Sequence, residues 1–185
     1  MSRVPSAVSF LFVGSVLLAT SAQAELVNRW AIGEGDSLAT IQFDFQDGDT
    51  YLFDVSFSGD SFTGQDVFVL LDAEENLFDF SYDVISYSFG DFLTGVGIED
   101  SYDYGAGDAG TNYWHYWNRD DASLAWESSM VGFGTRILTD GAEDAWVFGS
   151  DAAPSLIPLP GTLAMMAGGL ILHRRRCRVS NANQA

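Results

Sequence analysis

The chain has 185 residues and a formal net charge of −18, from eight arginines, no lysine and 26 acidic residues. This balance excludes a nucleic-acid-binding surface, because neutralising phosphates requires a patch of Lys and Arg. A hydrophobic content of 47% with 14% aromatic residues excludes a disordered acidic chain, and the single cysteine excludes an intramolecular disulfide. The length fits one domain with terminal segments.

Residues 1–24 have the three parts of a secretory signal peptide. Arg3 precedes a twelve-residue apolar run, residues 8–19, and Ala22 and Ala24 occupy the two small-residue positions that a signal peptidase reads. We expect signal peptidase to cleave after Ala24. An uncleaved membrane anchor is the alternative, but twelve residues are short for the ~30 Å hydrocarbon core of a bilayer.

The middle of the chain, residues 25–153, is predicted to be one exported, acidic, β-rich domain. All 26 acidic residues and three of the arginines lie within it, so its net charge is −23. Apolar and polar residues alternate over 41–45 and 51–57, which predicts two half-buried strands. Asp47-Gly48 between them is a strong turn signal, so we predict a β-hairpin here.

The segments that follow the hairpin predict an α+β fold, mainly antiparallel β with one short helix. Thr63 and Asp66 resemble a helix N-cap and favour a short helix over 66–75, with a buried strand as the alternative. Alternation over 77–87 predicts a strand, whereas the glycines of 90–97 favour a turn or short helix. The remaining predictions are a Gly-rich acidic loop at 99–112 and short strands at 113–118, 124–128, 136–138 and 146–148.

Five segments of this domain resemble, in order, the β-grasp-like domain at the C-terminus of transcobalamin and intrinsic factor. They are Val67–Ala73, Phe89–Val96, Trp114–Asn118, Leu138–Gly141 and Trp146–Phe148. The resemblance implies a β-grasp-like fold, with a helix followed by a loop, a Trp-containing strand and a late turn before the last strand. The vertebrate members of this family bind cobalamin with two domains. Because this sequence shows no large helical partner domain, we do not expect cobalamin binding.

His115 is the one histidine between the terminal segments, and it lies within an aromatic run, residues 113–117. One hypothesis is a flat aromatic platform of Trp114, His115 and Trp117 that binds a sugar or another small ring-bearing ligand. The alternative is a strand buried on both faces, with Tyr113, His115 and Trp117 on one side. A hydrolytic site around His115 stays open, but many Ser and Asp residues could be its partners, so we expect a non-enzymatic protein.

An acidic, Gly-rich loop contains the weak candidates for a metal site. Asp100, Asp103 and Asp108 lie close together in the sequence, and Ca²⁺ prefers several oxygen ligands. Their spacing fits no EF-hand, and a solvated acidic loop is the favoured alternative. We therefore expect no cofactor, with calcium as the candidate to test.

Residues 154–185 have the order of a membrane-directed tail. Pro158 and Pro160 precede an apolar run, residues 161–172, and a basic cluster follows it. This cluster consists of Arg174, Arg175 and Arg176. Arginines that flank an apolar segment remain on the cytoplasmic side, which agrees with export of the acidic domain. A buried core helix is the alternative to a short transmembrane helix, but a core helix seldom ends in a block of arginines.

This tail resembles the PEP-CTERM sorting signal of Gram-negative bacteria, which has a Pro-x-Pro motif, a short transmembrane helix and a basic end. The resemblance implies processing by an exosortase-like enzyme after transient anchoring in the inner membrane. It also implies a final location at the cell surface or in the extracellular matrix, where exopolysaccharide is a candidate partner. Leu159 replaces the usual Glu, and residues 177–185 extend beyond the usual end of such signals; both departures concern the efficiency of processing.

Overall fold

The computed structural model describes residues 25–88, 90–107 and 110–154. The predicted signal peptide, with Ala22 and Ala24, lies outside the described residues. So does the predicted sorting signal, with Pro158, Pro160, Arg174, Arg175 and Arg176. Within the described residues, no helix is both long enough and apolar enough to span a bilayer.

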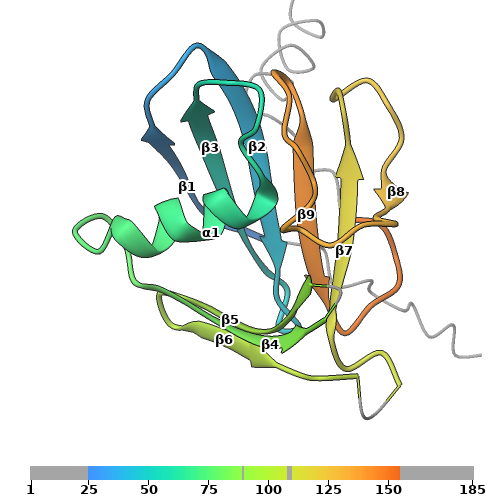
Figure 1. Cartoon of the computed structure of the whole chain (residues 1–185). Coiled ribbons are helices and arrows are strands. Elements are labelled where there is room, and N and C mark those ends of the chain that lie inside the picture. The colour runs from blue at the N-terminus through green and yellow to red at the C-terminus, as the bar shows by residue number, and fades with distance from the viewer. Residues whose placement is uncertain (1–24, 89, 108–109, 155–185) are drawn as a thin grey trace, which may run out of the picture.

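A mixed six-stranded sheet forms the main layer of the domain (Figure 1). Its strands in spatial order are β1 (Glu25–Gly33), β3 (Asp49–Phe57), β2 (Ser37–Asp44), β9 (Glu143–Phe148), β7 (Trp114–Arg119) and β8 (Glu127–Ser128). β1 is parallel to β3 and β9 is parallel to β2, while the other neighbours are antiparallel. The prediction of a β-rich domain with one short helix is confirmed, and this sheet is mixed, with three antiparallel and two parallel pairings.

The predicted hairpin is confirmed as the pair β2–β3. Phe43 lies opposite Tyr51, so the apolar residues of both strands share one face. At the turn, the Phe45 amide donates to the Asp49 carbonyl at 2.9 Å, and the Gly48 amide donates to the Phe45 carbonyl at 3.1 Å. Gly48 has a φ of 101°, which L side chains rarely adopt, so the Asp-Gly signal corresponds to a conformational requirement.

The predicted helix is confirmed as α1 (Gly64–Ala73), which lies across one face of the main sheet in Figure 1. Its N-terminus is a capping box: the Asp66 amide donates to Thr63 Oγ1 at 3.2 Å, and the Thr63 amide donates to Asp66 Oδ2 at 2.8 Å. These bonds satisfy two donors that a helix start leaves unpaired. The face of the helix that packs on the core carries three fully buried side chains, Val67, Phe68 and Leu71.

A second, antiparallel sheet closes one end of the domain in Figure 1, with β4 (Phe80–Tyr87), β5 (Gly90–Ile98) and β6 (Ser101–Tyr104). The predicted strand over 77–87 is therefore confirmed from residue 80. The prediction of a turn or helix over 90–97 was wrong, because these residues form β5. Leu93, Val96 and Ile98 are buried in the core, and this burial outweighs the weak strand preference of the neighbouring glycines.

Three further predictions need correction. Residues 99–112 are not a continuous loop, since they include β6, and of 124–128 only the last two residues form a strand, β8. Residues 136–138 form no strand and contribute an isolated bridge between Ile137 and Thr63. β1 was not predicted at all, because an edge strand with mostly exposed residues lacks strong alternation.

The core lies between the main sheet and the layer formed by α1 and the smaller sheet. Phe43 is fully buried near its centre, and its ring contacts those of Phe53, Phe68, Phe80, Trp114 and Trp146 at centroid distances of 5.3 to 6.2 Å. Aromatic side chains bury 150–250 Å² each, so they supply much of the stabilising apolar area. This cluster fixes β7 and β9, which carry the candidate site.

Candidate functional site

Of the three residues of the predicted aromatic platform, Trp114 and His115 line a common cavity and Trp117 does not, and the rings do not form one flat surface. Trp114 is 3% exposed, its ring contacts Phe45 and Phe148 at 5.2 Å, and its indole N–H donates to the Asp103 carbonyl at 3.3 Å. Side chains of neighbouring residues in a strand point to opposite faces, so Trp114 belongs to the core. The platform as predicted is therefore divided by the strand.

His115 lies on the opposite side of β7 from Trp114 and stacks on Tyr113, with ring centroids 3.9 Å apart. Its Nε2 lies 3.4 Å from the Thr111 carbonyl oxygen. Trp117, two residues further along, is partly exposed, although its indole N–H is buried without a hydrogen-bond partner among the described residues. No described carboxylate or hydroxyl is hydrogen-bonded to His115, so the geometry does not assemble a Ser-His-Asp arrangement around it.

A cavity of about 300 Å³ opens between the start of β5, the start of β7, the end of β8 and the loop 129–133. His115 on β7 and Tyr113, the second residue before it, line this cavity. Met130 and Val131 line it from the loop and are 95% and 50% exposed. The Ser129 amide donates to the Tyr116 carbonyl at 2.8 Å, which holds the loop against the edge of β7. The volume is at the small end of the range for small-molecule sites.

Two stacked rings from the core reach the wall of this cavity. Tyr116 and Trp146 lie 4.5 Å apart at an interplanar angle of 8°, and both line the cavity. The Tyr116 hydroxyl donates to Asp144, which is fully buried and also accepts from Arg136 Nε at 3.3 Å. Arg136 Nη1 in turn donates to Asp120 at 2.8 Å.

Burial sets the protonation behaviour of this cluster. It raises the pKa of Asp144 to about 6, although the hydrogen bond from Tyr116 and the charge of Arg136 act in the opposite direction. It also raises the pKa of Tyr116, as does the neighbouring Asp144, so the phenol stays protonated and donating. Because Asp144 has no exposed surface, its carboxylate fixes the ring of Tyr116 rather than meeting a ligand.

The calcium candidates are not brought together as a ligand set. Asp103 Oδ2 accepts from the Gln46 amide at 2.7 Å, and burial raises the pKa of the Asp103 carboxyl. Asp100 is exposed in a turn, and Asp108 lies outside the described residues. Within the described ranges, no group of three or more His, Cys, Asp or Glu side chains is placed to hold a metal ion.

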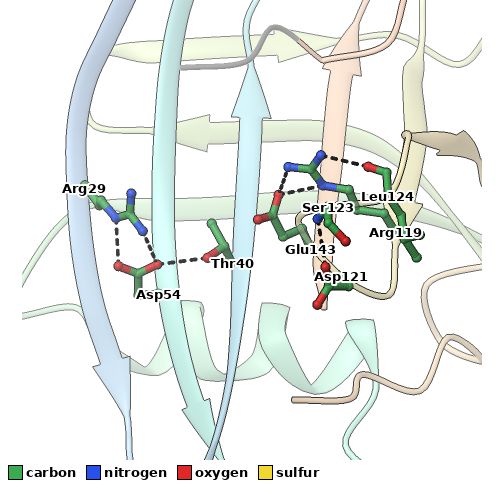
Figure 2. A network of polar contacts seen from close by, with 8 residues as sticks. All are labelled: Arg29, Thr40, Asp54, Arg119, Asp121, Ser123, Leu124 and Glu143. Atoms are coloured by element: carbon green, nitrogen blue, oxygen red, sulfur yellow. Dashed lines mark hydrogen bonds and ion pairs between the residues drawn. The ribbon is translucent and has the colours of Figure 1, made fainter. Parts of the chain in front are cut away.

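A row of polar side chains crosses the face of the main sheet opposite α1, as Figure 2 shows. Arg29 donates to both oxygens of Asp54 at 2.7 Å, and Thr40 donates to Asp54 at 3.0 Å. Arg119 Nε donates to Glu143 at 2.9 Å. These bonds link neighbouring strands and occupy both guanidinium groups, so the row is best explained as support for the sheet.

No family model matches the chain, and no curated protein matches it. Among solved structures, one similar chain comes from Ruminococcus gnavus ATCC 29149, a protein whose metal binding is itself a proposal. It is 19% identical, and the match covers 60% of this chain and 95% of that chain, with a TM-score of 0.38. A TM-score this low transfers neither a fold nor metal binding to this chain.

Sequence reasoning missed most of the residues that form the cavity. Met130 and Val131 follow two serines in a segment without periodicity, so no sequence signal marked them. Asp144 could have been found, because it lies two residues before Trp146 in a strand and therefore shares its inward face.

Proposed function

We propose that the protein is an exported, non-enzymatic surface protein whose domain binds a small neutral ligand with a ring, such as a sugar. The observation that carries the binding proposal is the cavity beside β7, where the stacked Tyr113 and His115 meet the exposed Met130 and Val131. Exposed apolar and aromatic groups around a concave site favour a ligand with an apolar face.

Export is supported by the sequence of the two terminal segments. The Glu25 amide donates to the Gly48 carbonyl at 2.9 Å, so the residue that would follow the cleavage site is already part of the sheet. We propose that the PEP-CTERM-like tail then directs the domain to the cell surface through an exosortase-like enzyme.

A β-grasp-like fold is part of the same proposal. It is supported by the strand order β3-β2-β9-β7-β8, in which the first hairpin is followed by a helix and the last strand is parallel to the first strand of the hairpin. The smaller sheet is inserted between that helix and β7. Nuclear Overhauser contacts between Phe43 on β2 and Trp146 on β9, which are register partners, would test this arrangement in solution.

Ligand binding can be tested by calorimetric titration of the full chain with a panel of neutral mono- and disaccharides. Val131→Asp places a charge at the cavity, and Val27→Asp is the matched control, since Val27 is 47% exposed on the distant edge strand β1. We expect binding of at least one sugar, lost in Val131→Asp and kept in Val27→Asp. Equal titrations in the two variants, or no binding of any sugar, would contradict the binding proposal.

The sorting proposal can be tested by cell fractionation in a Gram-negative host that has an exosortase. Replacing Arg174, Arg175 and Arg176 with neutral residues should leave the protein unprocessed or misplaced, because these arginines fix the cytoplasmic end of the segment. Unchanged processing and surface location of this variant would count against the tail as a sorting signal.

A further inference from the structure

The outer face of the smaller sheet presents an aromatic ring that is held flat. Gly95 and Gly97 lie in the middle of β5, where glycine weakens a strand, and both are buried. A Cβ on Gly97 would lie 3.2 Å from the ring of Tyr102, and one on Gly95 would lie 3.2 Å from its hydroxyl. The ring of Tyr102 therefore lies over the backbone of both glycines.

Both the hydroxyl and the backbone of Tyr102 are held in place. The Tyr102 hydroxyl donates to Asp83 Oδ2 at 3.1 Å, and Tyr102 pairs directly with Gly97 in the β5–β6 ladder. The opposite face of the ring remains open, because Tyr102 is still 58% exposed. Tyr104, on the same side of β6, is 53% exposed, so two rings stand next to each other on this surface.

The charges around this face limit the chemistry of its partner. Asp83 accepts a hydrogen bond from Tyr102, and Asp79 and Glu99 line a hollow beside the ring of Tyr102. All three arginines of the described residues are in ion pairs on the main sheet or its loops. The face therefore repels polyanions. Its carboxylates accept hydrogen bonds and donate none, which complements a polymer rich in hydroxyl donors.

We propose that this outer face of the smaller sheet, with Tyr102 and Tyr104, binds a neutral polysaccharide chain. Each ring packs on the C–H face of one sugar, and Asp83 accepts a hydroxyl bond at the edge of the ring. A ring already held in one orientation loses little conformational entropy on binding. The site is separate from the cavity beside β7 and does not require the cavity to bind anything.

Affinity electrophoresis tests this proposal. The purified full chain is run in native gels that contain hydroxyethylcellulose, xyloglucan or galactomannan, with alginate as the polyanion. We expect retardation by at least one neutral polymer and none by alginate. Tyr104→Ala should weaken this binding about tenfold, as expected for losing ~55 Å² of apolar contact, and Tyr102→Phe should retain most of it because the ring remains.

Two variants show whether polysaccharide binds at this face or in the cavity, and whether a loss of binding is due to unfolding. Tyr104 is exposed, so Tyr104→Ala should keep the wild-type melting temperature, and its lost binding then cannot be attributed to unfolding. Val131→Asp should bind polysaccharide as the wild type does; if it alone abolished retardation, the cavity would be the binding site and this proposal would be wrong. Absence of retardation by every neutral polymer, unchanged binding in Tyr104→Ala, or a Tyr104-dependent dimer in gel filtration would also overturn it.

Discussion

Replacing Asp144 with Asn should remove a specific pH dependence of stability. Burial raises the pKa of Asp144 from its ordinary 3.8 to about 6, so the folded protein holds this proton more tightly than the unfolded chain. The resulting stabilisation is complete below about pH 4 and is lost as the pH rises through 6. The difference between the two pKa values corresponds to about 3 kcal/mol.

The assay is urea unfolding at several pH values, followed by tryptophan fluorescence. Between about pH 4 and pH 7.5, the wild type should lose about 3 kcal/mol more free energy of unfolding than Asp144→Asn, because Asn does not ionise. Asp60→Asn, at an exposed loop position, is the matched control and should follow the wild type. If Asp144→Asn showed the same pH profile as the wild type, the assigned burial effect would be refuted.

Three substitutions test the packing of the fold by urea unfolding. Phe43→Ala should lower the free energy of unfolding by about 3–5 kcal/mol, because it empties the centre of the aromatic core. A decrease below about 1 kcal/mol would contradict the central position of Phe43 in that core. Thr63→Ala should lower the free energy of unfolding by about 1 kcal/mol, because the capping box is lost. A decrease no larger than that of the control Ser61→Ala would argue against the cap. Gly35→Ala should destabilise more than Glu34→Ala, since a Cβ on Gly35 would lie 2.0 Å from the Phe57 carbonyl oxygen; equal stability would be inconsistent with that close approach.

The features that were predicted from sequence are those that depend on neighbouring residues. The β2–β3 hairpin follows from alternation and from Asp47-Gly48, and the start of α1 follows from Thr63 and Asp66, three residues apart. In each case, the hydrogen-bond partners of the backbone groups lie only a few residues away in the sequence. Local patterns are sufficient for such elements.

The features that were missed depend on residues far apart in the chain. β5 is a strand although it contains Gly95 and Gly97, because its apolar residues are buried in the core and Tyr102 on the next strand covers the glycines. β9 is parallel to β2 across about 100 residues of sequence, and no local pattern specifies that pairing. The cavity beside β7 depends on a loop that is held by a backbone bond to Tyr116.

The candidate site was therefore only partly predictable. The aromatic run of β7 was identified, and the strand alternation correctly placed Tyr113 and His115 on one side. Trp114 lines the cavity but offers no open ring face, because it is 3% exposed and packs in the core against Phe45 and Phe148. A strand of consecutive aromatic residues supplies both the core and the surface, and the sequence does not mark which ring remains free for a ligand.

The central claim, that this domain works outside the cytosol, is tested most directly by the mass of the mature protein. The full chain is produced in a Gram-negative host with an exosortase, the surface and extracellular fractions are isolated, and the N-terminal residue is determined by mass spectrometry. We expect a chain that begins at Glu25 and is found in those fractions. A chain that retains residues 1–24 and is found in the cytosol would contradict the claim.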